Sequence, residues 1–367
     1  MAVNKWMSRL TADFGVAASK LRTSQPEAIP SWSPSLNWAT TQGGYIPGKV
    51  NIFYGPESSG KSMLAMMAIV ELQRRDPEAI SIWFDAEFSF NFNMFDKLGG
   101  DPERLVVRKS NDPLKIFDYI GGEMLELIQD GAPIKAIVID SIKSIRYPKD
   151  VRKQTTDQIM GGSGSQYLGS ALKLTIPVVA EHKLLTIFVQ QVTAQMDPMR
   201  ALRNPYVISE GHALKHAADL MLEITRVDSK KGSVEHGSTI TGATAQVGHK
   251  VRVKVKKNRL GPPARQAEFT FHYDQGIIDT GGEVFELAKA LGVIYHPVNP
   301  ETGRENAQMW QFASDAPIRG EANIKAAVVE DHSLQDRILK ACYAHQDAKV
   351  ETDESGFIKD DETETYE

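Results

Sequence analysis

A glycine-rich loop between an apolar strand-like run and a helix-like run restricts most strongly how this chain can fold. The run VNIFY precedes GPESSGKS, and the apolar segment SMLAMMAIVELQ follows directly. The loop fits G-x-x-x-x-G-K-[ST], in which glycines let backbone N–H groups point at phosphate oxygens, the lysine reaches the outer phosphates and the last hydroxyl binds Mg²⁺. A chance glycine-rich turn is the alternative, and the flanking strand and helix argue against it. The predicted nucleotide-binding residues are Gly55, Pro56, Glu57, Ser58, Ser59, Gly60, Lys61 and Ser62.

Apolar runs of strand length alternate with helix-like segments between residues 30 and 280. Continuous apolar strands separated by helices are typical of a parallel sheet covered on both faces. The later runs follow one another closely and alternate polar with apolar residues, so we expect antiparallel strands at one edge. The predicted fold class is therefore α/β with a mainly parallel central sheet. The runs are KVNIFY, ISIWFD, LVVR, KAIVID, LLTIFVQQ, LMLEIT, KVRVKVKK and AEFTFHY.

Composition divides the chain into four segments. Residues 1–29 combine an amphipathic helix with a turn-rich linker, and this helix packs either on its own domain or on a neighbouring subunit. Residues 30–280 form the core, and residues 281–346 form a smaller α/β unit. Residues 347–367 carry dense charge and few apolar side chains, so we expect a disordered tail.

The charge is unevenly distributed. The formal net charge is −5, but residues 347–367 hold nine acidic residues and two lysines, which is −7 and leaves +2 for the rest (−5 + 7). Cys342 is the only cysteine, which excludes an internal disulfide and fits a reducing compartment. The sequence has no signal-peptide-like start and no apolar run near the ~18 residues of a membrane span. We therefore expect a cytoplasmic protein without a membrane partner.

Acidic and amide side chains follow three of the apolar runs. Asp140 ends KAIVID, where a carboxylate can support a nucleotide-bound metal ion. Glu87 follows SIWFDA and is the candidate general base that activates water. Gln190 and Gln191 end TIFVQQ, where an amide can hydrogen-bond a γ-phosphate and signal its presence. Each also has a simpler interpretation as a polar strand end, and for the two glutamines the chemistry alone does not choose.

Two long segments, residues 149–166 and 192–211, carry basic side chains among glycine, serine and apolar residues. Loops of this length in a compact domain are usually functional or disordered. Basic groups can bind phosphates while aromatic or apolar groups stack on bases, which is the composition of a single-stranded DNA site. Two mobile surface loops are the alternative. The candidate DNA-binding residues are Arg152, Lys153, Arg200, Arg203 and Tyr206.

Together these motifs resemble the RecA-type homologous recombinases, and in length and tail the chain is similar to phage-encoded UvsX-type members. The resemblance runs from about Ser33 to Gly282. It is carried by LNWATTQGGYIPGKVNIFYGPESSGKS, WFDAEF, IVIDS, IFVQQ, HALK and KVRVKVKKNRLGPPARQAEFTFHYDQGI.

The resemblance implies a RecA-like P-loop ATPase core with an N-terminal oligomerisation helix. It also implies an ATP-dependent helical filament that binds single-stranded DNA, finds homologous double-stranded DNA and exchanges strands. Single-strand-binding and loading proteins are the further partners that it implies. For a phage-encoded protein the location would be the cytoplasm of the host cell.

The resemblance also implies roles for individual residues. Residues 55–62 bind ATP and Mg²⁺, Asp140 supports the metal, Glu87 activates water, and Gln191 senses the γ-phosphate. The segments 149–166 and 192–211 correspond to the two DNA-binding loops.

Lys257 and Arg259, in the motif KKNR, match the pair that reaches the ATP of a neighbouring subunit. Alternate positions at a strand end place both side chains on one side. There they would neutralise transition-state charge as arginine fingers do.

The chain departs from the family pattern at three places. The aromatic residue expected to stack on adenine is replaced by Met94, with Phe92 nearby. The glycine pair before HALK is Glu210-Gly211, and the aromatic residue after it is His216.

Two other functions share these features. A hexameric DNA helicase would use the same loop and a residue from its neighbour, but the N-terminal segment is short for it. An ATP-binding DNA-coating or mediator protein would need no turnover, and the combination of Asp140 with Glu87 argues against it.

Overall fold

The structure, a computed structural model, describes residues 26–146, 163–196, 199, 206–208, 211–227, 233–236, 245–299 and 303–345. It separates into two compact units, Met1–Ile278 and Asp279–Glu367. The helix expected before residue 26 and the acidic tail lie outside the described residues. None of the helices within the described ranges combines the length and the apolar character of a membrane span.

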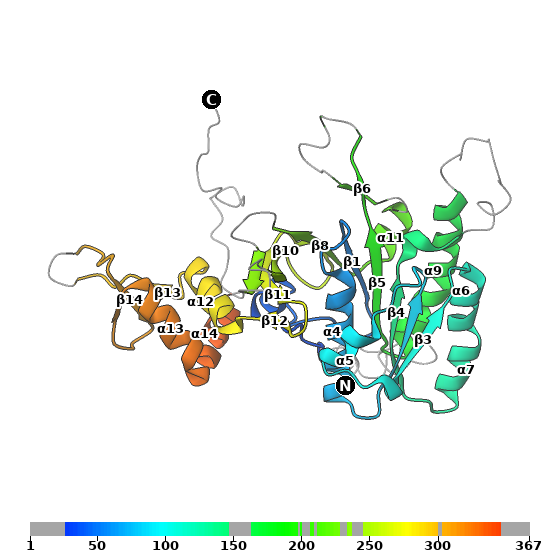
Figure 1. The fold of residues 1–367 in the computed structure, drawn as a ribbon, viewed down its shortest axis with the longest axis horizontal. Helices are drawn as coiled ribbons and strands as arrows, with labels where there is room; N and C mark the ends of the chain where they lie inside the picture. The colour runs from blue at the N-terminus through cyan, green and yellow to red at the C-terminus, as the bar shows by residue number, and fades with distance from the viewer. Residues whose placement is uncertain are drawn as a thin grey trace, which may run out of the picture. The chain divides into compact units, whose positions relative to one another are not determined.

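A ten-stranded sheet forms the centre of the larger unit (Figure 1). Its strands are β1 (Val50–Gly55), β2 (Ile80–Asp85), β3 (Leu105–Lys109), β4 (Ile134–Asp140), β5 (Leu185–Gln191), β8 (Leu220–Arg226), β9 (Ser233–His236), β10 (Ala245–Asn258), β11 (Gln266–His272) and β12 (Gly276–Ile278). Their order is β12-β11-β10-β8-β1-β5-β4-β2-β3, and β9 also pairs with β10. The strands from β8 to β3 pair in parallel, and β9 to β12 pair antiparallel. The expected mainly parallel sheet with an antiparallel edge is confirmed.

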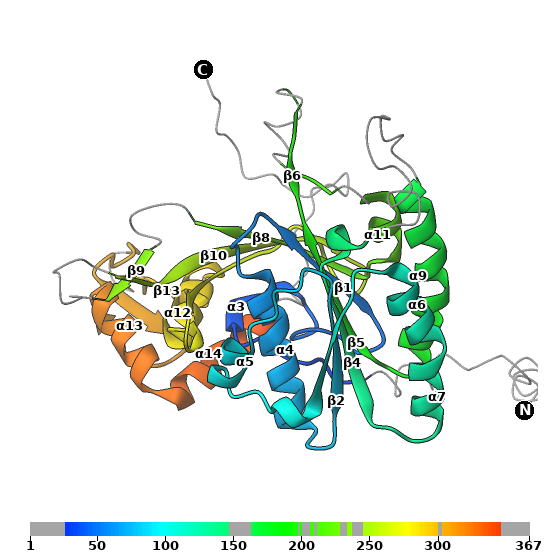
Figure 2. The ribbon, with the colours of Figure 1, turned by 45° about the vertical axis from the view of Figure 1, so that its right-hand side comes forward.

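Helices cover both faces of the parallel strands, as Figure 2 shows. On one face lie α3 (Pro34–Ala39), α4 (Lys61–Arg75) and α5 (Phe92–Lys97), and on the other lie α6 (Pro113–Gly121), α7 (Glu123–Gln129), α9 (Ser163–Glu181) and α11 (Gly211–Ala217). Two short 3₁₀ helices flank strands of the sheet. The first, η1 (Pro102–Arg104), directly precedes β3, and the second, η2 (Ile142–Ser144), comes just after β4. The separation of helices between the two faces explains why β1, β2 and β5 are buried along almost their whole length.

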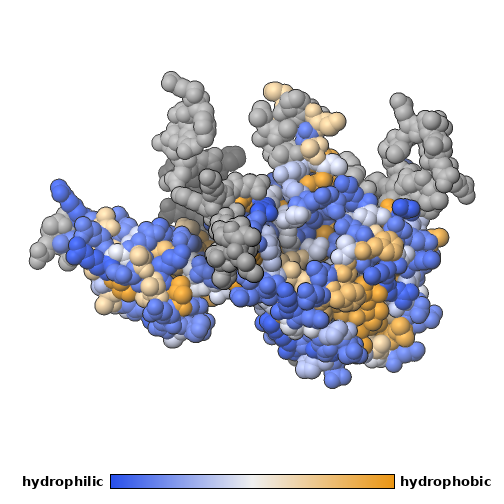
Figure 3. All heavy atoms as spheres, viewed as in Figure 1, coloured by the Kyte–Doolittle hydropathy of each residue, from blue (hydrophilic) through white to orange (hydrophobic). Residues whose placement is uncertain are grey.

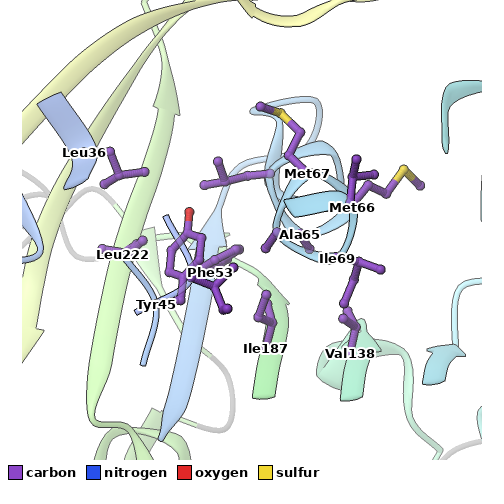
Figure 4. Packing of buried hydrophobic residues seen from close by; sticks show 14 of the residues in the cluster. Leu36, Tyr45, Phe53, Ala65, Met66, Met67, Ile69, Val138, Ile187 and Leu222 are labelled. Carbon is purple, nitrogen blue, oxygen red and sulfur yellow. The ribbon is translucent and has the colours of Figure 1, made fainter. Parts of the chain in front are cut away.

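The core of the larger unit consists of two apolar clusters, one on each face of the sheet. Because successive strand side chains point to opposite faces, Phe53 packs against α4 while Ile52 packs against the α6 and α9 side. Figure 4 shows the first cluster, with Phe53 and Tyr45 beneath Ala65 and Met67 of α4. Burial of the apolar side chains from Leu64 onward therefore holds helix α4 against this face of the sheet.

Strand register brings several polar strand ends to one edge of the sheet. Gly55 of β1 pairs with Gln191 of β5, and Asp85 of β2 pairs with Asp140 of β4. Parallel strands present their carboxyl ends at the same edge, which is where open α/β sheets bind ligands. The fold thus assembles the loop after β1 and the ends of β2, β4 and β5 at one place.

Strand β3 ends the sheet, and no other strand among the described residues pairs with its outer side. Val106 of this strand is 45% exposed, and Leu114 on α6 is 49% exposed. Figure 3 shows apolar surface gathered over this part of the larger unit. An open strand edge beside apolar side chains is a template for pairing with another chain.

The smaller unit contains α12 (Thr280–Ala290), β13 (Ile294–Tyr295), β14 (Met309–Phe312), β15 (Ile318–Arg319), α13 (Glu321–Glu330) and α14 (His332–Ala344). Its strands form an antiparallel sheet in the order β13-β14-β15. The Asp279 side chain caps α12 by accepting from the Gly282 N–H. Phe285, Val328 and Cys342 are buried where the helices pack.

In the larger unit a short ribbon extends the chain beyond β5. Strand β6 (Thr193–Ala194) pairs antiparallel with β7 (Tyr206–Val207). The ribbon begins two residues after Gln191, the last residue of β5.

Candidate active site

The loop between β1 and α4 depends on two glycines for different reasons. Gly60 has φ of +94°, and a Cβ there would lie 2.3 Å from Phe271 Cε2 of β11. A Cβ on Gly55 would lie 1.9 Å from the Ile224 carbonyl oxygen of β8. Only glycine fits at both positions, so the loop can lie close against β8 and β11.

Helix α4 begins at Lys61, directly after this loop. Its N-cap residue, Gly60, has no side chain to cap the first N–H groups of the helix. Uncapped N–H groups at the positive end of a helix dipole form an anion site. The loop and helix start therefore fit the phosphates of a nucleotide.

Lys61 is buried inside the loop, with 6% of its surface exposed. Its ammonium donates to the Pro56 carbonyl oxygen at 2.5 Å and to Ser59 Oγ at 3.5 Å. Burial lowers the pKa of Lys61, and the charges of Asp140, Glu87 and Glu57 partly oppose this. A phosphate in the loop would supply the anionic partner that favours the charged ammonium.

Ser62 and Asp140 meet beside Lys61. The Ser62 hydroxyl donates to the Asp140 carboxylate, which is 6% exposed. Burial raises the pKa of Asp140 to about 6, with further contributions from Glu87 and Asp85 that Ser62 and Lys61 oppose. A hydroxyl and a carboxylate side by side are hard oxygen ligands, so this pair fits Mg²⁺ carried by a nucleotide.

Glu87 lies where β2 and β4 end together. The N–H groups of Ala86 and Glu87 both donate to the Asp140 carbonyl oxygen, at 2.8 and 3.3 Å. The Glu87 carboxylate accepts from Ser141 Oγ and from Gln191 Nε2, at 2.5 and 2.8 Å. The candidate base thus lies next to both the candidate metal ligand and the candidate sensor.

The two glutamines at the end of β5 lie in different environments. Gln190 is buried, and its amide donates to the Gln191 carbonyl oxygen at 3.1 Å. Gln191 is half-buried and contacts Glu87. The structure therefore brings Gln191, and not Gln190, to the side chains of the site.

Lys257 and Arg259 lie at the end of β10 against the C-terminal end of α11. Lys257 Nζ donates to the Lys215 carbonyl oxygen, and Arg259 donates to the His216 carbonyl oxygen at 2.7 Å. Burial lowers the pKa of Lys257, and the charge of Arg259 acts in the same direction. Both side chains thus lie on one side, although β10 has an irregularity between Val255 and Lys257.

The residues near the expected adenine position differ in accessibility. Phe92, the first residue of α5, is 50% exposed. Its ring lies edge-on to the ring of Phe90, with 4.8 Å between the two ring centroids. Met94 is half-buried and packs against the core cluster of the α4 face. Phe92 therefore offers the more accessible surface for stacking on a base.

Of the candidate DNA-binding residues, Tyr206 lies within the described part of the chain. Arg152, Lys153, Arg200 and Arg203 lie outside the described residues. Tyr206 lies in β7, opposite Ala194 of the ribbon that follows Gln191.

Three polar residues without a predicted role contact side chains of the predicted site residues. Ser141 and Ser144 lie next to Glu87, and Asp219 pairs with Arg259 at 3.3 Å. Only Ser141 had a signal in the sequence, since it directly follows the metal-ligand candidate. The other two are brought in by the turn after β4 and by the turn between α11 and β8.

Comparisons with known proteins agree with this geometry. The family model for the RecA N-terminal domain matches residues 2–278. The chain is 31% identical to Protein RecA of Aquifex aeolicus over 340 residues, which cover 90% of this chain and 89% of that protein. It is 30% identical to Protein RecA of Lactobacillus delbrueckii subsp. bulgaricus over 325 residues, covering 84% and 91% of the two chains. Protein RecA of Herpetosiphon aurantiacus is 31% identical over 325 residues, with 85% and 84% covered.

Proposed function

Since the chain belongs to the RecA family, we propose that it is a DNA-dependent ATPase that forms helical filaments on single-stranded DNA. In these filaments it catalyses homologous pairing and strand exchange in recombination and repair. The observation that carries the proposal is the contact between Glu87 and Gln191 at 2.8 Å. It joins a candidate water-activating group to the strand end that continues into the ribbon and the segment 192–211.

ATP binds along the loop of residues 55–62, with its phosphates at the N-terminal end of α4. Lys61 exchanges its contact with the Pro56 carbonyl for the outer phosphates. Ser62 and Asp140 hold Mg²⁺, which supplies positive charge to the phosphate oxygens when bound. The ring of Phe92 stacks on adenine, with Met94 behind it.

Glu87 accepts a proton from the attacking water as a general base. Gln191 gives up its hydrogen bond to Glu87 when a γ-phosphate offers a stronger, charged acceptor. The same step moves the end of β5 and the ribbon that follows it. Nucleotide state is thereby coupled to DNA binding, as in switch loops that a γ-phosphate orders.

Lys257 and Arg259 act on the ATP of the adjacent subunit and neutralise negative charge in the transition state. They leave the end of α11 to do so. Hydrolysis then requires a neighbour, so turnover occurs in the filament and not in isolated subunits.

DNA binds at the segments 149–166 and 192–211. Arg152, Lys153, Arg200 and Arg203 contact phosphates or stack on bases, and Tyr206 offers an aromatic face. These contacts track the backbone of a single strand and leave the base edges available for pairing with a homologous duplex.

Filament contacts use the N-terminal helix of residues 1–29, donated to the neighbouring subunit. The open edge of β3 and the exposed side chain of Val106 support self-association, because an unpaired apolar edge favours addition of another chain. Single-strand-binding and loading proteins would assist assembly. We also propose that the protein is similar to the phage-encoded UvsX-type members and that it acts in the cytoplasm.

Electron microscopy and strand-exchange assays test the proposal together. With ATP and single-stranded DNA we expect helical filaments and joint molecules with homologous duplex. Closed rings that unwind duplex would instead identify a helicase, and coated DNA without exchange would identify a mediator. Lys61→Ala is the control: it should abolish ATP turnover and with it these products, because the loop has no other cation for the phosphates.

A further inference from the structure

Hydrogen-bond donors converge on one oxygen of Glu87. Ser141 Oγ donates to Glu87 Oε1 at 2.5 Å, Gln191 Nε2 donates to the same atom at 2.8 Å, and Ser144 Oγ lies 3.5 Å from it. Within the described part of the chain, no group donates to Glu87 Oε2. The carboxylate is therefore fixed through one oxygen, and the other remains available to a water molecule.

The two serines form a chain of hydroxyl groups that ends at this carboxylate. Ser141 Oγ and Ser144 Oγ lie 3.2 Å apart. A hydroxyl carries a single proton, and Ser141 makes its shorter contact with Glu87. Ser141 therefore donates to Glu87, and Ser144 donates to Ser141. Ser141 is fully buried, where a charge-assisted hydrogen bond is stronger than in water.

We propose that Ser141 is a positioning residue for Glu87, and that Ser144 supports it through Ser141. This inference rests on the proposed function, because it takes Glu87 as the general base. Ser141 sets the direction of the carboxylate so that Oε2 faces the attacking water. Without the hydroxyl, the Glu87 side chain samples other rotamers and spends less time in the productive one.

The placement of these serines gives them a second consequence. Ser144 belongs to η2, which leads toward the segment 149–166, whereas Gln191 leads toward the segment 192–211. The base thus receives hydrogen bonds from residues that precede each of the two candidate DNA-binding segments in the chain.

The first experiment compares kcat and KM for ATP in the presence of single-stranded DNA. A hydrogen bond to a charged group contributes enough to change a rate by about tenfold, so Ser141→Ala should lower kcat about tenfold and leave KM within about twofold. Ser144→Ala should lower kcat by about threefold, since it acts through Ser141. Ser81→Ala is the matched control, because Ser81 is a buried serine of β2 whose hydroxyl has no hydrogen-bond partner among the described residues. It should keep the kcat of the wild type.

A double-mutant cycle separates positioning from a general structural role. In a Glu87→Ala background, Ser141→Ala should have no further effect on the residual single-turnover rate, because the group that it orients is gone. A further tenfold loss in that background would overturn the proposal, and so would a wild-type kcat for Ser141→Ala alone.

Folding defects are controlled by thermal unfolding and by a conservative variant. Ser141→Thr keeps the hydroxyl and should retain at least half of the wild-type kcat if the protein folds. If both changes at position 141 prevent folding, Ser144→Ala decides, and an unchanged kcat for it would reject the serine chain. Absence of DNA-dependent ATP hydrolysis in the wild-type protein would instead reject the proposed function itself.

Discussion

Arg259 and Asp219 form an ion pair at 3.3 Å that ties the end of β10 to the turn between α11 and β8. The Arg259 side chain is half exposed, so the pair contributes less than about 1 kcal/mol and can be exchanged for a stronger partner. Lys257 is held in the same way by the Lys215 carbonyl oxygen. Both cations therefore have contacts within their own subunit that compete with a neighbour's phosphates.

Replacing Lys257 and Arg259 together by alanine should abolish ATP turnover while ATP binding to isolated subunits stays within about twofold of wild type. The reason is that these cations act on the neighbour's nucleotide and not on their own. Mixing experiments check this. Subunits with the double change and subunits with Lys61→Ala should each be inactive alone but recover DNA-dependent hydrolysis when combined.

The recovery should follow the mixing ratio and be greatest near equal amounts. Lys256→Ala is a suitable control, since it removes a neighbouring cation of β10, paired with Glu223, that is not one of the two predicted to reach the adjacent ATP. No recovery at any ratio would mean that the site is not shared between subunits.

Glu87→Gln should separate nucleotide binding from hydrolysis. Glutamine keeps the shape and can still accept from Ser141 and Gln191, but it cannot take a proton from water. We expect hydrolysis to fall by about 10²- to 10⁴-fold, with ATP affinity unchanged and with long-lived filaments. Glu103→Gln, which removes an exposed carboxylate from η1, should leave all three properties unchanged. Loss of ATP binding in Glu87→Gln would indicate a structural role for Glu87.

Replacing Arg200 and Arg203 by alanine should weaken single-strand binding and flatten its dependence on salt. Each lost phosphate contact lowers the slope of log K against log salt by about 0.7, so the pair should lower it by about 1.4. A double variant of Arg75 and Lys97 has the same net charge but removes cations already paired with carboxylates. Its slope should equal that of the wild type, and an equal slope in the first variant would place the DNA elsewhere.

Cys342 should report on the folding of the smaller unit. Burial raises the pKa of its thiol from 9.0 to about 11, so at pH 8 the folded protein holds about a hundredfold less thiolate than the unfolded chain. Alkylation at pH 8 should therefore be slow without denaturant and fast in urea. The raised pKa favours the folded state below pH 9, and this contribution is lost as the pH rises from 9 to about 11. Fast labelling of the native protein would show that α14 opens locally.

The strands and the nucleotide loop could be predicted because their signals are local. Every apolar run that was expected to be a strand forms a strand in the structure. The length of an apolar run and its content of β-branched residues can be read from a short segment alone. Lys61, Ser62, Asp140 and Glu87 come together because parallel strands end at one edge, which follows from the fold class alone.

Side-chain direction at the strand ends could not be predicted. Gln190 and Gln191 are adjacent in sequence, and which of them faces Glu87 depends on the pairing of β5 with β1 and β4. The Ser144 contact requires the turn of η2, and the Asp219 contact requires α11 to end beside β10. These are long-range arrangements that no short segment encodes.

The contact between Gly60 and Phe271 limits how this chain can diverge. An alanine at position 60 meets two separate obstacles, the ring of Phe271 and a backbone conformation with φ of +94°. A smaller residue at position 271 would relieve the first obstacle but not the second, so no single compensating change rescues the substitution. Position 60 is therefore restricted to glycine by the loop backbone itself, even in a variant with a smaller residue at position 271.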